Sequence, residues 1–126
     1  MIGVQNVTKY YGRICALDRI SFEVKSGEIV GLLGPNGSGK TTLMRILTGF
    51  FPATEGVVQV AGLDVATSSL EVRSRIGYLP ENVVLYPDMS VQAFLNFCAL
   101  VKIDGVLQRR SNVEWVLNEC ALEDMA

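Results

Sequence analysis

One stretch of the sequence combines residue types that suit phosphate binding. It matches the pattern G-x-x-x-x-G-K-[ST] and consists of Gly34, Pro35, Asn36, Gly37, Ser38, Gly39, Lys40 and Thr41. Gly37 and Gly39 can adopt positive φ angles without a Cβ clash, so consecutive backbone amides can turn towards an anion. Because no side chain at these glycines blocks the approach of the phosphates, the backbone amides become the predicted ligands.

The residues that follow predict a full set of contacts to a triphosphate. We expect the Lys40 ammonium to contact the β- and γ-phosphates, and the Thr41 hydroxyl to coordinate Mg²⁺ held by the same oxygens. Thr42 can assist at the α-phosphate. A helix that starts near Lys40 would add unpaired N–H groups and the positive end of its dipole. The residues alone thus predict a site for a nucleoside triphosphate with Mg²⁺, and the alternative is a flexible surface turn over residues 34–39.

The segments on either side of this loop are expected to position it. Residues 28–33 are apolar on both faces and include two β-branched residues, which is typical of a strand covered on both sides in a parallel sheet. From Lys40 to about Thr48 apolar residues recur at helical spacing, and Gly49 follows where a helix would end. The predicted order is therefore strand, loop, helix, the context in which the pattern indicates phosphate binding.

Other segments predict further strands and helices. Alternation with period two indicates a half-buried strand at residues 20–24, and residues 56–62 predict a short strand between glycines. Residues 69–75 predict a helix of one to two turns, and residues 75–80 a strand that ends at a proline.

The pattern changes at about residue 87, after which both predicted elements are helices. Residues at i, i+3, i+4 and i+7 form two apolar stripes, which consist of Val91, Phe94, Leu95 and Cys98, and of Val113, Val116, Leu117 and Cys120. Core packing is the expected role of both stripes. We predict an α/β fold with a mixed β-sheet around the phosphate-binding helix in residues 1–86, followed by a helical part in residues 87–126.

Composition excludes several classes of protein. The chain has 126 residues, 49% of them hydrophobic, with 11 basic against 13 acidic residues, which argues against a disordered chain and against a basic nucleic-acid-binding protein. Histidine is absent, so Ser-His-Asp, Cys-His and most zinc chemistry is excluded. Cys15, Cys98 and Cys120 have neither disulfide nor zinc spacing and are expected to be small apolar core residues.

The chain is also expected to be cytoplasmic. Its longest apolar runs are only a few residues long, far short of the roughly 20 that cross a bilayer. The N-terminus has no basic region followed by an apolar stretch, so a secretory signal is not expected. Any role at a membrane would therefore need a partner.

The base of the nucleotide is indicated by two features. The chain holds no N-K-x-D string of the kind that reads guanine, so adenine is favoured. Tyr11 offers a ring ahead of the loop, and stacking a purine on it would contribute about 1–3 kcal/mol, by analogy with nucleic-acid sites. A strand-end tyrosine without a ligand is the alternative.

Several segments together resemble the ATP-binding domains of ATP-binding cassette (ABC) transporters. The resemblance runs from residue 2 to about residue 100 and rests on residues 7–12, 16–17, 20–22, 27–43, 47–49, 56–58 and 76–81. It implies that Tyr11 stacks on adenine, that the loop keeps the roles given above, and that the ligands are ATP and Mg²⁺. Residues 79–82 and 85–91 are similar to the branch that serves ABC-2-type exporters.

Two departures from the family pattern bear on activity. Glu81 stands where the family usually has the glutamine of its Q-loop; it could still meet Mg²⁺ through a water, and a solvated loop carboxylate is the alternative. The L-S-G-G-Q signature, the strand that ends in Asp-Glu and the switch histidine are absent, and neither Asp64 nor Asp88 is placed to replace the missing carboxylate. We therefore expect no catalytic residue and little hydrolysis by this chain alone.

The resemblance also implies partners. Family members pair two cassettes around two ATP molecules and drive transmembrane subunits, so we expect a second cassette, a membrane partner, a location on the cytoplasmic face of the membrane and no nucleic acid. The missing motifs predict a fragment, with an incomplete core in residues 1–86 and a truncated start of the helical subdomain in residues 87–126. A non-catalytic interaction fragment that binds nucleotide weakly is the alternative, and a P-loop kinase is a more distant one.

Overall fold

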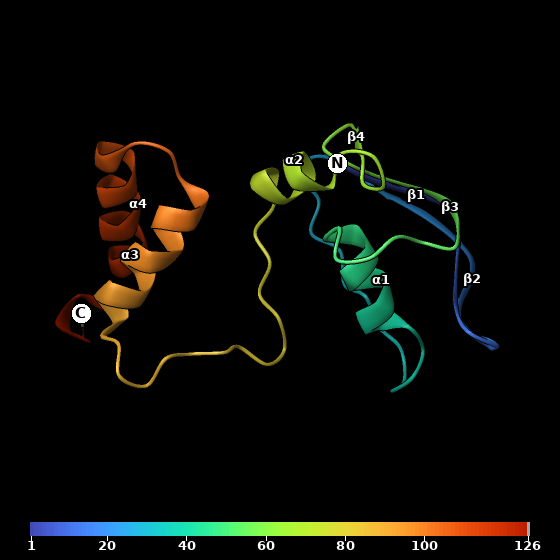
Figure 1. Cartoon of the computed structure of the whole chain (residues 1–126), viewed down its shortest axis with the longest axis horizontal. Coiled ribbons are helices and arrows are strands. Elements are labelled where there is room, and N and C mark those ends of the chain that lie inside the picture. The colour runs from blue at the N-terminus through green and yellow to red at the C-terminus, as the bar shows by residue number, and fades with distance from the viewer. Residues whose placement is uncertain (126) are drawn as a thin grey trace. The chain divides into compact units, whose positions relative to one another are not determined.

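The computed structural model describes residues 1–125 and divides into two compact units. The first unit is Met1–Tyr78 and the second begins at Leu79. Figure 1 shows the first with all the strands and two helices, and the second as a pair of helices. Each unit has a hydrophobic core of its own.

A four-stranded antiparallel sheet is the frame of the first unit. Its strands are β1 (Ile2–Tyr11), β2 (Ile14–Val24), β3 (Glu55–Val60) and β4 (Leu63–Asp64), in the order β2-β1-β3-β4. β1 and β2 form a long hairpin whose register runs from Ile2 opposite Val24 to Tyr11 opposite Ile14. The strands predicted at residues 20–24 and 56–62 are confirmed within β2 and β3.

Two helices pack with this sheet. Helix α1 (Lys40–Leu47) buries Leu43 and Ile46, and α2 (Ser69–Arg75) buries Val72. The same core contains Val4, Val7, Leu17, Val58, Val60 and Val65. Both helices lie where the sequence predicted them. In α1 the apolar residues at helical spacing form the buried face. The sheet and α1 together hold the loop at residues 34–39.

Two predicted strands do not form. Residues 28–33 and 76–80 have no strand structure, and the side chains of Ile29 and Leu33 are more than 90% exposed. A strand needs a neighbour to pair its backbone N–H and C=O groups. Within residues 1–125 the sheet pairs none of its strands with either segment. The prediction of a covered parallel strand before the loop is therefore wrong, and the described sheet is antiparallel throughout.

The pairing of β1 with β3 depends on a glycine. The register of this pair shifts between Gln5 and Thr8, where Asn6 has a φ of 48°. Gly56 faces this irregularity with a φ of 88°, and a Cβ there would collide with the carbonyl oxygens of Gln5 and Asn6. Gly56 thus allows a close approach that a larger residue would prevent.

The second unit is a helical hairpin. Helix α3 (Val91–Lys102) begins after Ser90, whose Oγ accepts a hydrogen bond from the Ala93 N–H at 3.2 Å. Helix α4 (Val106–Glu119) follows, and a 3₁₀ turn (Glu123–Met125) comes near the end. The core of this unit consists of Ala99, Val113 and Leu117, with Val91, Leu95, Ile103 and Leu122 packed around it. Both predicted helices are confirmed, as are Val91, Leu95, Val113 and Leu117 as packing residues.

The cysteines differ from the prediction. Cys15 and Cys120 are exposed and Cys98 is half-buried, so the expectation of three core residues is wrong. Cys15 lies near the tip of the β1–β2 hairpin, and Cys120 follows the last residue of α4. Both are at the ends of elements, beyond the packed part of their unit, which residue type alone does not reveal.

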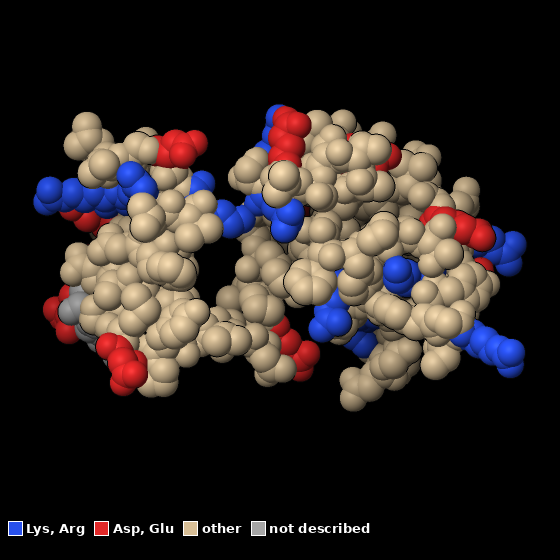
Figure 2. All heavy atoms as spheres, viewed as in Figure 1, with Lys and Arg blue, Asp and Glu red and all other residues tan. Residues whose placement is uncertain are grey.

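Charged side chains are interspersed on the surface. On the face shown in Figure 2, lysine, arginine and acidic residues lie among larger uncharged areas. The ion pairs Arg19–Asp18, Arg75–Glu71 and Arg110–Glu114 are exposed, and each joins residues close together in the sequence. No helix within residues 1–125 has the length and apolar character that a membrane span requires.

The glycine at position 56 provides a test of this fold. We expect Gly56→Ala to destabilise the protein by about 1–3 kcal/mol, because it adds a Cβ to a left-handed backbone position that also faces two carbonyl oxygens. The measurement is the midpoint of urea unfolding. Gly3→Ala is the matched control in the same sheet, since its Cβ would meet nothing within 4 Å. Equal midpoints for the two variants would contradict this account.

Candidate nucleotide-binding site

The backbone of the glycine-rich loop has the predicted conformation. Gly37 has a φ of 82° and Gly39 a φ of 90°, so the expected positive angles are confirmed. The Ser38 N–H donates to the Pro35 carbonyl at 3.2 Å, which closes a tight turn. Residues 34–38 are exposed, and a Cβ at Gly37 would meet nothing within 4 Å. The turn therefore presents its backbone to solvent.

Lys40 closes the loop from within. Its Nζ donates to the carbonyl oxygens of Gly34 at 2.6 Å and Pro35 at 2.7 Å, and lies 3.3 Å from the Ser38 Oγ. The ammonium is thus held by neutral oxygens at the start of the loop. This places one full positive charge beside the turn, as the sequence predicted.

The loop is fixed to the hairpin at Gly39. This residue is the N-cap of α1, and its carbonyl accepts a hydrogen bond from the Leu43 N–H at 2.9 Å. A Cβ at Gly39 would collide with the Ala16 carbonyl oxygen and the Leu17 side chain, so the start of α1 lies directly against β2. Helix α1 has no side-chain cap and no acidic residue in its first turn. Its first N–H groups and its dipole therefore favour an anion at this end.

The two threonines after Lys40 differ in exposure. Thr41 is exposed and Thr42 is half-buried, both in the first turn of α1. Thr41 can therefore present its hydroxyl to a cation in solvent. Among the described residues no group of three or more His, Cys, Asp or Glu side chains is arranged to hold a metal ion by itself.

Tyr11 lies at the end of β1, in contact with residues that the sequence analysis did not include. Its ring meets the Phe51 ring edge to face, with centroids 5.9 Å apart and an interplanar angle of 84°. The Lys9 Nζ lies 5.5 Å from the centre of the Tyr11 ring. Lys9 and Tyr11 are two residues apart on a strand and so share a face, a signal present in the sequence. The part played by Phe51, 40 residues away, had no such signal.

The neighbouring Tyr10 is in a different environment. It pairs across the hairpin with Cys15. The electrostatic influence of Cys15 and a side-chain hydrogen bond with Cys15 raise the pKa of the Tyr10 phenol, because both disfavour the tyrosinate. Tyr10 therefore stays neutral at physiological pH and contributes no charge near Tyr11.

The remaining predicted residues lie elsewhere. Glu81 is exposed in the second unit, before α3, and its role at Mg²⁺ stays a prediction. Asp64 accepts hydrogen bonds from the N–H groups of Ala66 and Thr67, at 2.7 and 3.4 Å, so its carboxylate stabilises a turn. Asp88 is exposed in the segment before α3.

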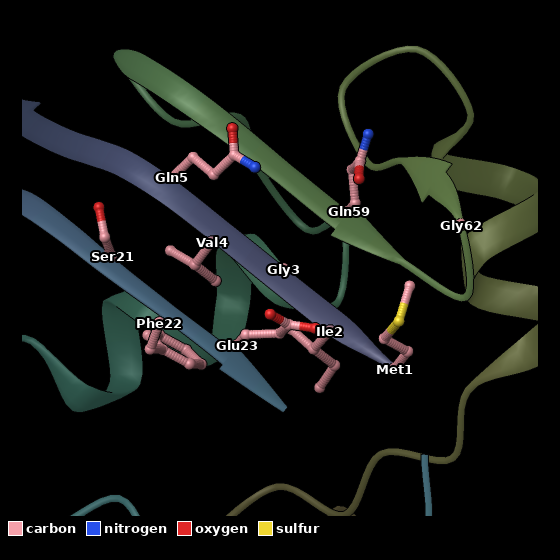
Figure 3. Close-up of a pocket in the computed structure, with 10 residues that line it drawn as sticks. All are labelled: Met1, Ile2, Gly3, Val4, Gln5, Ser21, Phe22, Glu23, Gln59 and Gly62. Carbon is pink, nitrogen blue, oxygen red and sulfur yellow. The ribbon is translucent and has the colours of Figure 1, made fainter. Parts of the chain in front are cut away.

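A hollow on the sheet is a poor alternative site for phosphate. It has a volume of about 500 Å³ and opens over Gly3, whose cross-strand neighbours are Glu23 and Gln59 (Figure 3). Among the side chains that line it the charged one is Glu23. A carboxylate repels phosphate, so the loop at residues 34–40 is the better anion site.

Comparison with known proteins finds similarity to the ATP-binding proteins of ABC transporters. The family model described as ABC transporter matches residues 17–126. The sulfate/thiosulfate import ATP-binding protein CysA of Nephroselmis olivacea is 37% identical over 123 residues, which make up 98% of this chain and 36% of that protein. The probable multidrug ABC transporter ATP-binding protein YbhF of Escherichia coli (strain K12) is 39% identical over 97 residues, or 77% of this chain and 17% of that protein.

A solved structure supports the same assignment. The dimeric ATP-binding cassette MJ0796, bound to ADP and Pi, superposes with a TM-score of 0.83 at 27% identity, over 100% of this chain and 60% of that chain. The predicted α/β fold of the P-loop ATPases is thereby confirmed. The chain spans less than half the length of the two curated relatives. With a glycine-rich loop whose Gly37 and Gly39 have the predicted positive φ and a family match over most of its length, this chain belongs to the ABC transporter family and corresponds to part of its ATP-binding proteins.

Proposed function

We propose that this chain binds Mg-ATP through residues 34–42 and acts as an ATP-binding part of an ABC transporter. The observation that carries the proposal is the Lys40 ammonium, held by the carbonyls of Gly34 and Pro35 at the uncapped start of α1. A lysine beside exposed backbone amides and a helix N-terminus is suited to an anion with several negative charges.

The ammonium can exchange its present partners for phosphate. Two neutral carbonyls hold Lys40, whereas phosphate oxygens would add the attraction between opposite charges to the hydrogen bonds. The loop backbone is already arranged with Gly37 and Gly39 at positive φ, so binding requires little reordering. We infer that the triphosphate takes over the ammonium while the glycine backbone provides amide donors.

The other ligands are those that the family resemblance implies. We infer that the exposed Thr41 hydroxyl coordinates Mg²⁺, with Glu81 contributing through a water, and that Thr42 lies at the α-phosphate. Pro35, Asn36 and Ser38 belong to the loop that would surround the phosphates. Tyr11 supplies a ring for adenine. Mg²⁺ here would neutralise phosphate charge beside the ammonium.

The proposed partners are a transmembrane subunit and a second cassette. Relatives named for sulfate/thiosulfate import and for multidrug transport support the first, and the dimeric solved cassette supports the second. Both would place the chain on the cytoplasmic face of a membrane. We further propose that the membrane partner is of the ABC-2 exporter type.

One observation favours a second candidate, an interaction fragment. An apolar hollow of about 600 Å³ lies beside α1 and is lined in part by Val30, Leu32 and Tyr78, from the two segments that were predicted as strands. Exposed apolar residues of this kind seek a partner surface. In this candidate function nucleotide binding is weak and Lys40 is not important.

Removal of the Lys40 ammonium separates the two candidates. We expect Lys40→Ala to weaken Mg-ATP binding by about 1.5–3 kcal/mol, because it removes hydrogen bonds to a charged ligand. Isothermal titration calorimetry on the 126-residue chain measures this. Lys25→Ala is the control, since it removes a lysine away from the loop. An unchanged affinity in Lys40→Ala would favour the interaction fragment.

Hydrolysis should be slow even where binding is tight. The Asp64 carboxylate accepts hydrogen bonds within a turn, and the sequence lacks the strand ending in Asp-Glu that supplies this carboxylate in the family. Phosphoryl transfer depends on a positioned nucleophile and on charge stabilisation. We expect a phosphate-release assay with saturating Mg-ATP to show little or no turnover. Robust release that disappears in Lys40→Ala would contradict this expectation.

A further inference from the structure

Three side chains from two distant segments meet at the end of β1. The Lys9 Nζ lies 5.5 Å from the centre of the Tyr11 ring and 4.8 Å from the centre of the Phe51 ring. The two rings meet edge to face at 5.9 Å. We call Lys9, Tyr11 and Phe51 the Tyr11 cluster. Its members fix one another, since the cation faces both rings and the rings face each other.

Hydrogen bonds hold the cluster in place from both sides. The Lys9 Nζ donates to the Pro52 carbonyl at 2.8 Å, which fixes the ammonium. The Thr54 N–H donates to the Thr8 carbonyl at 2.9 Å, and the Tyr10 N–H donates to the Thr54 Oγ1 at 3.0 Å. The segment after α1 is therefore attached to β1 along the stretch that carries Lys9 and Tyr11.

The same helix links the cluster to the phosphate site. At its N-terminal end Gly39 lies against Ala16 and Leu17 of β2. Beyond its C-terminal end Phe51 packs against the core and meets Tyr11. Since Lys9 and Leu17 are register partners, the N-terminal end of α1 and Phe51, which follows the helix, contact the same part of the hairpin. The orientation of the Tyr11 ring is thus coupled to the position of the loop at residues 34–40.

We propose that Lys9 and Phe51 are positioning residues that hold the Tyr11 ring ready for the base of the bound nucleotide. This inference rests on the proposed function, in which residues 34–42 bind the triphosphate. Tyr11 is 44% exposed, so its ring remains accessible while Lys9 and Phe51 restrain it. A restrained ring loses less side-chain freedom when a base stacks on it, and affinity rises accordingly.

The test compares a ligand that has a base with one that does not. Calorimetry on the 126-residue chain gives dissociation constants for Mg-ATP and for Mg-tripolyphosphate. Lys9→Met keeps the aliphatic stem and removes the charge, and we expect it to weaken ATP binding about two- to fivefold. Phe51→Leu removes the edge-to-face contact and should weaken it about two- to tenfold. Tripolyphosphate binding should stay unchanged in both variants.

Two further variants distinguish positioning from a general structural effect. Lys9→Arg retains a cation that can face both rings, so it should restore the affinity of the unaltered chain for ATP. Lys25→Met removes a lysine outside the cluster and should change neither ligand. If Phe51→Leu fails to fold, Lys9→Met still decides the question, since it alters only the end of a partly exposed side chain.

The possible failures are distinguishable. Equal weakening of ATP and tripolyphosphate in Lys9→Met, or unchanged ATP affinity, would overturn the positioning role and leave the phosphate site intact. Absence of tripolyphosphate binding to the unaltered chain would contradict the proposed function itself and, with it, this inference.

Discussion

The arrangement of this site depends on the contact between the Lys40 ammonium and the backbone of its own loop. The carbonyls of Gly34 and Pro35 hold the charge at 2.6 and 2.7 Å, and this closes residues 34–40 into a ring. The two carbonyls stabilise the ammonium of Lys40, and a polyanion would attract the same ammonium more strongly. The loop is therefore stable by itself and still able to exchange its ligands.

The packing of α1 determines where that charge lies. Leu43 and Ile46 bury one side of the helix against the sheet, and the close contact of Gly39 with Ala16 sets its N-terminus against β2. A helix of eight residues that begins against β2, and is followed by a contact between Phe51 and Tyr11, has little freedom to rotate or slide. The dipole of α1, the lysine and the Tyr11 ring consequently keep a fixed relation to the hairpin.

Local patterns predicted the features that local forces determine. The apolar spacing around Leu43 and Ile46 identified α1, residues 69–75 identified α2, and the glycines at 37 and 39 identified the turn. The strand prediction for residues 28–33 was wrong because a strand requires a partner strand, and no periodicity within the segment shows whether one is adjacent. The prediction that the cysteines are core residues was wrong for a related reason. Cys15 and Cys120 lie at the ends of elements, where residue type says little about burial.

The contact between Tyr11 and Phe51 is a feature of the candidate site that the sequence pattern could not predict. A strand places Lys9 and Tyr11 on one face by its period of two, so that half of the cluster can be derived. Phe51 reaches them because the segment after α1 is hydrogen-bonded to β1 through Thr54. The position of this aromatic contact therefore depends on the length and direction of a helix whose N-terminal end lies against the same part of the hairpin.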